Sequence, residues 1–174
     1  VVWIFYQSAA VQVASVSDGA NTYHQACPPT AMPNNPQFSQ EIWYAWDIAA
    51  ASGVAVSAAF SGATPVEVQV SAHEYSNAYQ EPDGPLADTP PPGSAGANGT
   101  SIGTVSLMTR GRLVFGASIV RDGQEAPGAG FTPRSTLANN MAEDMNVPSP
   151  STPVAATFGN PASEDWAAQM ITLK

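Results

Sequence analysis

An all-β fold is predicted by three features of this 174-residue sequence. Apolar side chains recur at every second residue in most segments, which is the period of a half-buried strand rather than of a helix. Clusters of Gly, Pro, Asn and Ser interrupt the alternation at short intervals, as turns between strands do. No stretch keeps a helical period for more than about two turns. The length suits one domain with its own core, so we expect a single domain over residues 1–174.

The first half of the chain opens with residues 1–6, which are apolar on both faces. Such a strand is expected to be covered on both sides. Residues 27–37 hold a cluster of prolines and are expected to form a surface loop, because proline cannot donate to a hydrogen-bonded ladder. Alternating segments predict a hairpin with a first strand at residues 11–16, a turn at 18–21 and a return that begins at Tyr23. They also predict strands at residues 54–60 and 66–75.

Residues 41–48 combine aromatic and acidic side chains in one predicted strand. Successive side chains of a strand point to opposite faces, so counting by twos separates them into two sets. We expect the isoleucine-bearing set to face the core and the other set to face outward. The inward set is Ile42, Tyr44, Trp46 and Ile48, and the outward set is Glu41, Trp43, Ala45 and Asp47.

The second half has long connections. Residues 76–103 and 148–153 are rich in Pro, Gly and Ser and are expected to be loops. Several short strands separated by such loops predict a two-sheet antiparallel β-sandwich of the jelly-roll or immunoglobulin-like type. The strands expected here are residues 112–120, one or two within 131–147, 154–158, and 166–174, the last near the middle of a sheet.

Charge limits the partners. Only 11% of the residues are charged, against roughly 25% in an average soluble protein, and 14 acids outnumber 5 bases to give a net charge of -9. Nucleic acid is therefore an unfavourable partner, and no apolar run is long enough to predict membrane insertion. The polar, weakly charged composition favours an extracellular or cell-surface location. The chain starts inside an apolar strand, so we expect it to be excised or processed from a longer secreted precursor.

Short motifs that recur together lie along nearly the whole chain. Their residues are Asp18, Asn21, Thr22 and Tyr23, then Glu74, Tyr75 and Ser76, then Pro127, Gly128, Gly130, Phe131 and Thr132, and finally Trp166. In these motifs the chain resembles jelly-roll or immunoglobulin-like β-sandwich domains of large secreted bacterial proteins, although Asn77 stands where their pattern prefers Gly. The resemblance implies secretion and a role in surface attachment or assembly, and it implies no catalytic residues.

A sugar-binding platform is the first candidate site. An outward Trp43 beside Glu41 and Asp47 would stack on a sugar ring and bond its hydroxyl groups, and His73 and Tyr75 on a nearby strand would widen the platform. The expected partner is a glycan or another cell-surface polymer. The alternative is that a loop or a neighbouring subunit covers Trp43.

Catalytic and metal sites are weaker candidates. Glu74 falls on the predicted core face, where burial would raise its pKa as a general acid requires, but the mechanism needs a second acid nearby. Glu74 is equally a structural carboxylate paired with an arginine. Calcium is the one cofactor considered, with Asp18, Asn21 and Asp83 as loop ligands that serve equally well as turn formers.

Three functions remain open from the sequence. The first is a non-catalytic extracellular module for surface attachment or carbohydrate binding. The second is a structural subunit of a cell-surface filament or layer, in which residues 1–7 add a strand to another copy of the chain. The third is a glycoside hydrolase that uses Glu74.

Overall fold

The computed structural model describes residues 1–8, 10–78, 84–110, 113–122, 126–147 and 152–174, and it confirms the all-β prediction. The strand pairs among these residues are antiparallel, as expected for a sandwich. The strands are β1 (Val2–Gln7), β2 (Gln12–Ser17), β3 (His24–Ala31), β4 (Phe38–Tyr44), β5 (Ser57–Ser61), β6 (Glu67–Ala72), β7 (Ser94–Gly103), β8 (Leu107–Thr109), β9 (Leu113–Val120), β10 (Ala126–Pro127), β11 (Thr132–Ser135), β12 (Met141–Asn146), β13 (Thr152–Val154) and β14 (Thr157–Leu173). A 3-10 turn, Leu137–Asn139, precedes β12.

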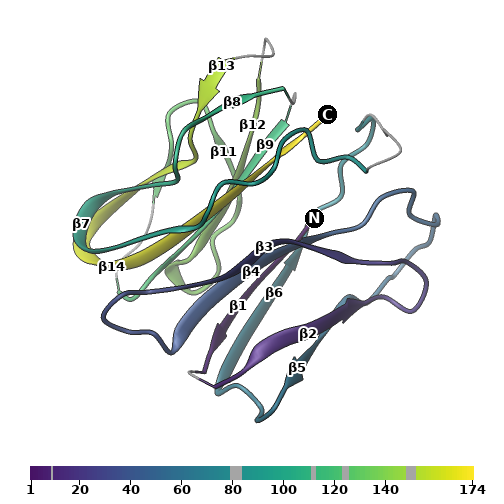
Figure 1. The fold of residues 1–174 in the computed structure, drawn as a ribbon, viewed down its shortest axis with the longest axis horizontal. Helices are drawn as coiled ribbons and strands as arrows, with labels where there is room; N and C mark the ends of the chain where they lie inside the picture. Colours follow the sequence, from purple (N-terminus) through teal and green to yellow (C-terminus); the bar gives the residue numbers. More distant parts are fainter. Residues whose placement is uncertain (9, 79–83, 111–112, 123–125, 148–151) are drawn as a thin grey trace.

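Two sheets pack face to face, and a two-stranded ribbon covers the outer side of one of them (Figure 1). The central sheet has the order β3-β4-β1-β6. The larger sheet has the order β10-β14-β9-β12-β11, and β7 also pairs with β14. The β2–β5 ribbon lies on the side of the central sheet away from the larger sheet, so the molecule has three layers.

The first strand is covered on both faces, as predicted. On one side, Trp3 and Phe5 pack into the core between the two sheets, against residues that include Phe115. On the other side, Ile4 and Tyr6 pack under the β2–β5 ribbon. The strand pairs with β4 along one edge and with β6 along the other. A continuous apolar run is therefore the expected composition for β1.

The larger sheet curves around a second apolar cluster. Phe158 and Met170 of β14, Ile102 of β7 and Val154 of β13 are buried together on its other face. The strand β14 runs through this sheet between β7 and β9, which confirms that the C-terminal strand is interior. Among the residues described, no helix is long and apolar enough to span a bilayer.

Three segments predicted as loops contain strand residues. The last two residues of the predicted loop at 148–153 belong to β13, which pairs with β8. Residues 24–31 form β3 despite Pro28 and Pro29, because β3 is an edge strand with irregular register, where missing amide donors are tolerated. Residues 94–103 form β7, which pairs with β14. Its Gly96 is required by packing, since a Cβ atom there would lie 2.7 Å from the Trp166 indole.

The predicted faces of residues 41–48 are wrong beyond the first residues. Ile42 is buried as expected, but Glu41 on the other face is fully buried as well. The strand ends at Tyr44, and the chain then bends, with Asp47 at a φ of 52°. Alternation stops where the strand stops, so Ile48 is 43% exposed rather than in the core.

The predicted faces of residues 66–75 are reversed. Val66 and Val68, assigned to the core, are 86% and 40% exposed, and Glu74 is exposed too. The polar set, which includes His73 and Tyr75, points toward the larger sheet and packs against Phe115. Because β6 is an edge strand, the ribbon reaches only Val70 on its outer face.

Candidate functional site

A groove of about 700 Å³ opens at one end of the central sheet. Antiparallel pairing places the start of β1 beside the ends of β4 and β6, so the segments that follow those strands meet there. The groove is lined by the first residues of the chain, the turn after β2, the segment after β4 and the segment after β6. The lining is drawn mainly from residues 1–2, 18–23, 44–56 and 72–78.

Most of the candidates from the sequence converge on this groove. Trp43 and Glu41 are excluded from the lining and lie in the layer under the ribbon. Asp83 lies outside the described residues. The candidates that line the groove are Asp18, Asn21, Asp47, His73, Glu74 and Tyr75.

The aromatic wall of the groove is Tyr44 and Trp46, which the sequence had assigned to the core. Their rings are stacked, with centroids 5.5 Å apart and planes at 19°, and both are half-buried. The exposed His24 ring lies 4.6 Å from Trp46. A Cβ atom at Gly84 would lie 3.5 Å from the indole, so this backbone also borders Trp46. The Ala-rich run and Gly53 after Trp46 are the sequence signal that the strand ends here.

Asp18 organises the turn at one side of the groove. Its carboxylate accepts hydrogen bonds from the amides of Ala20 (2.9 Å) and Asn21 (2.8 Å), from the Asn21 side chain (2.6 Å) and from the Tyr23 hydroxyl (3.1 Å). These bonds, the Asn21 side chain first, hold the pKa of Asp18 well below its usual range. Asn21 Oδ1 in turn accepts from the amide of Ala49 at 2.9 Å, which ties the turn to the segment after β4.

The calcium hypothesis gains no support from this turn. The oxygens of Asp18 and Asn21 already accept hydrogen bonds from the protein. Within the described part of the chain, no group of three or more His, Cys, Asp or Glu side chains is placed to hold a metal ion. Asp18 and Asn21 act as turn formers here.

Glu41 is a buried structural carboxylate rather than part of an exposed platform. It accepts from the Tyr6 hydroxyl at 3.0 Å, the Val13 amide at 3.2 Å, the Gln25 side chain at 2.7 Å and the Trp43 indole at 3.1 Å. These donors come from β1, β2, β3 and β4, so one carboxylate ties the ribbon to the central sheet. The indole nitrogen of Trp43 donates its hydrogen bond to Glu41, and the ring packs against the apolar cluster under the ribbon.

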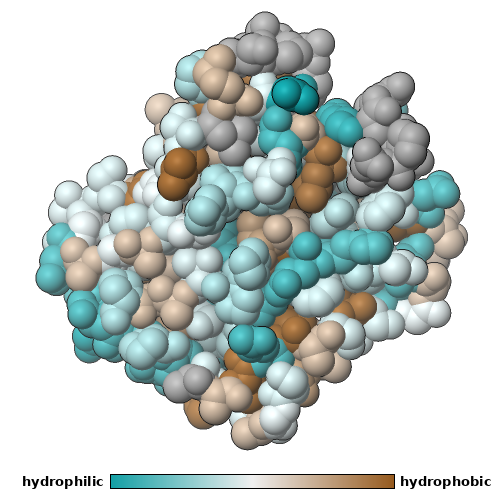
Figure 2. Space-filling view, viewed as in Figure 1, coloured by the Kyte–Doolittle hydropathy of each residue, from teal (hydrophilic) through white to brown (hydrophobic). Residues whose placement is uncertain are grey.

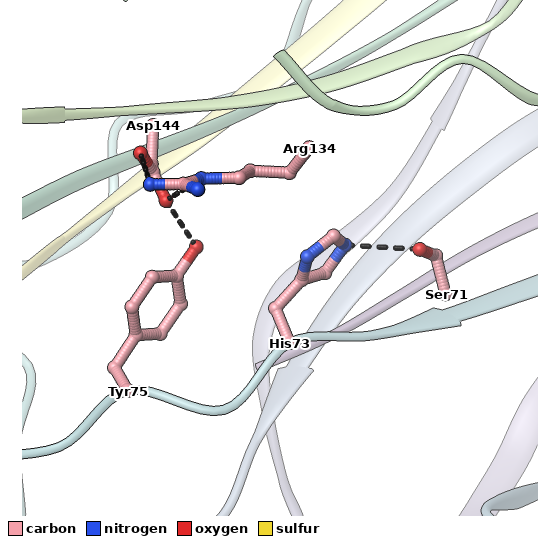
Figure 3. Close-up of polar contacts among 5 residues, drawn as sticks. All are labelled: Ser71, His73, Tyr75, Arg134 and Asp144. Atoms are coloured by element: carbon pink, nitrogen blue, oxygen red, sulfur yellow. Dashed lines mark hydrogen bonds and ion pairs between the residues drawn. The ribbon is translucent and has the colours of Figure 1, made fainter. Parts of the chain in front are cut away.

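His73 and Tyr75 leave the end of β6 and turn toward the larger sheet (Figure 3). The Tyr75 hydroxyl donates to Asp144 Oδ2 at 2.9 Å, and Arg134 clamps the same carboxylate with two bonds of 2.7 and 2.9 Å. Burial, followed by this hydrogen bond, raises the pKa of Tyr75. Tyr75 thus fixes one wall of the groove to β12.

A hydrogen-bonded serine and histidine pair lies beside this wall. Ser71 Oγ is 2.9 Å from His73 Nε2, which is the contact that a serine nucleophile makes with its base. The carboxylate oxygens of Asp144 are occupied by Arg134 and Tyr75, and Ser71 does not line the groove. Burial lowers the pKa of His73 to about 4, which makes it a weak base at neutral pH. The arrangement does not complete a catalytic triad.

Comparison with known proteins gives no relative: no protein-family model matches the sequence, and no curated protein or solved structure is significantly similar to it.

Proposed function

We propose that this protein is a non-catalytic extracellular module that binds carbohydrate in the groove at the end of the central sheet. The stacked pair of Tyr44 and Trp46 carries the proposal. Aromatic rings in a groove provide an apolar surface for a sugar ring, and side chains such as Asp47 beside them provide acceptors for its hydroxyl groups. The proposed sugar-binding platform therefore includes Trp46 instead of Trp43, which was predicted from the sequence.

The pre-formed frame of the groove supports binding rather than a purely structural role. The Asp18 turn, the Ala49 amide and the link from Tyr75 to Asp144 hold its walls together through hydrogen bonds. A ligand therefore meets walls that are already ordered, which lowers the entropy cost of binding. The weakly charged composition and the resemblance to secreted sandwich domains support the extracellular assignment and a role in surface attachment.

The test is a glycan array followed by titration calorimetry on the best ligand. Trp46→Ala should weaken binding by about tenfold or more, since losing one central aromatic contact costs roughly 1–3 kcal/mol. Trp43→Phe is the matched control, because it alters a tryptophan outside the groove and should bind as the parent does. Thermal melting of both variants establishes that they are folded. Undiminished binding by Trp46→Ala, or loss of binding in Trp43→Phe alone, would refute this location.

The other two functions have less support. The filament hypothesis relied on residues 1–7 as a donated strand, but β1 pairs with β4 and β6 of its own chain. The hydrolase hypothesis relied on a buried Glu74, and that side chain is exposed. Neither hypothesis has an observation in the fold that favours it over binding.

A further inference from the structure

The side chains that line the groove carry more negative than positive charge. Three of its lining side chains are carboxylates, Asp18, Asp47 and Glu74, and none of the described lining residues is a lysine or arginine. The excess of acids in the whole chain, 14 against 5 bases, adds to the same potential.

The described arginine and lysine side chains lie outside the lining of the groove. Arg134 is engaged with Asp144 at 2.7 Å, and Arg121 lies beside Asp122 at 3.4 Å. Arg110 and Lys174 line a separate groove with residues 86–90.

Two further basic groups lie among the lining residues, His73 and the α-amino group of Val1. Burial lowers the pKa of His73 to about 4, so its ring is mostly neutral where a sugar amine is protonated. The α-amino group of Val1 donates to the carbonyl oxygen of His73 at 2.8 Å, and burial lowers its pKa to about 6, against a smaller opposing effect of the Glu74 charge. Against three carboxylates, the described lining therefore sets one cation, the Val1 ammonium beside Glu74, and this cation forms only in acidic solution.

Aromatic rings next to an excess of carboxylates recognise a particular ligand chemistry. A cationic amine is attracted by the face of an indole or phenol ring and by the carboxylates around it. Asp47 follows Trp46 directly in sequence and is exposed, so it is placed to meet a charge on a ligand held against the aromatic wall. An anionic polysaccharide would meet repulsion at the same place.

We infer that the groove binds a polysaccharide whose sugars carry free amino groups, with the rings against Tyr44 and Trp46 and the ammonium groups beside Asp47 and Glu74. This inference rests on the proposed carbohydrate binding and names the class of sugar.

The test compares two hexasaccharides with the same sugar backbone: glucosamine hexamer with free amines, and its fully N-acetylated counterpart, in which uncharged acetamido groups replace the amines. Calorimetry at a pH where the amines are protonated should show the free hexamer binding about tenfold more tightly or better. Raising sodium chloride to about 0.5 M should weaken the free hexamer and leave the acetylated one unchanged, because salt screens exposed charges.

Charge variants assign the effect to the groove. Asp47→Asn should weaken the free hexamer by about two- to fivefold, as expected for one exposed ion pair, and should leave the acetylated hexamer unaffected. Glu67→Gln is the matched control, since it removes the same charge from an exposed β6 position outside the groove.

The outcomes separate the inference from the function on which it rests. Equal binding of both hexamers would overturn the amine preference and leave carbohydrate binding intact. Binding of neither hexamer, together with a blank glycan array, would overturn both. A lysine hexapeptide that binds as tightly as the free hexamer and loses affinity equally in Asp47→Asn would also overturn the inference, because the groove would then recognise cations without a sugar ring.

Discussion

Replacing Glu143 with glutamine is expected to stabilise the protein above neutral pH and to change little near pH 5. Glu143 lies on β12 with its side chain fully buried, and its carboxyl group accepts a hydrogen bond from the Gly128 amide at 2.8 Å. Burial raises the pKa of Glu143 to about 7, against smaller opposing effects from the Gly128 and Thr157 amides, and the charge of Asp144 adds to the increase. Glutamine keeps an oxygen for the Gly128 amide and cannot ionise.

The direction of the effect follows from proton binding. In the unfolded chain the carboxyl group titrates near 4.5, whereas in the folded protein it holds its proton to about 7. The contribution of Glu143 to stability is therefore complete below about pH 4.5 and is lost as the pH rises through about 7. Above that range, folding must bury a charge.

The magnitude follows from the same two values. The pKa difference, from 4.5 to about 7, at about 1.4 kcal/mol per tenfold change in proton affinity, gives an upper limit of about 3.5 kcal/mol. Relaxation and water penetration reduce such penalties, so we expect Glu143→Gln to gain about 2 kcal/mol between pH 5 and pH 9 relative to the parent.

The assay is urea denaturation of parent and variant at several pH values. Their difference in free energy of unfolding removes contributions from groups common to both proteins. Glu67→Gln provides the control for the loss of one negative charge at an exposed site. A difference for Glu143→Gln that stays constant from pH 5 to pH 9 would refute the assignment of a raised pKa to this carboxyl group.

Three further predictions address the layers of the fold. Glu41→Ala should lower the free energy of unfolding by about 3 kcal/mol or more in urea denaturation, because donors from four strands lose their acceptor and each buried donor left unsatisfied costs roughly 1–3 kcal/mol. A loss as small as that of the exposed Glu67→Ala would contradict this role. Gly116→Ala should lower the free energy of unfolding by about 1–3 kcal/mol, because the added Cβ atom would overlap the Cβ atom of Ala156. Gly103→Ala is the control: its added Cβ atom would lie 3.6 Å from the nearest atom, so this variant should have a melting temperature close to that of the parent. The free energy of unfolding should fall as the pH drops from 6.5 through about 4, because burial makes His73 harder to protonate in the folded protein than in the unfolded chain. His73→Asn should show a shallower fall. An identical dependence on acid pH in both proteins would contradict the burial of the His73 ring.

Several features were predictable because they depend on short-range pattern. The alternation of apolar residues identified most of the strands, and the double-sided apolar run at residues 1–6 correctly predicted a strand covered on both faces. The Asp18 turn was also predicted, since a short side chain that bonds nearby amides depends only on its own neighbours. The hairpin expected around this turn is wrong, because β2 pairs with β5 and β3 pairs with β4.

The binding site was only partly predictable. Asp47, His73 and Tyr75 do line one groove. The prediction placed Tyr44 and Trp46 in the core because the alternation of apolar residues continues to Ile48, whereas the strand ends at Tyr44. Trp43 was assigned to the outside because the ribbon that covers it comes from residues far away in the chain. On the face drawn in Figure 2, hydrophobic residues lie in separate patches among polar ones. Because apolar residues occur on the surface as well as in the core, the apolar character of one aromatic residue does not predict whether that residue is buried.

The amino-acid pattern is enough to establish an all-β protein, because a period of two and frequent turn residues leave β-strands as the main way to pair the backbone and bury the apolar side chains. Which face of each strand is buried depends on the packing of distant segments, because alternation divides a strand into two faces but does not specify what covers either one. Around β6 the polar face points toward the larger sheet, while Val66 and Val68 of the valine face meet solvent and only Val70 reaches the ribbon, the reverse of the pattern's usual meaning. The groove likewise exists only through long-range pairing, which places the start of β1 beside the ends of β4 and β6.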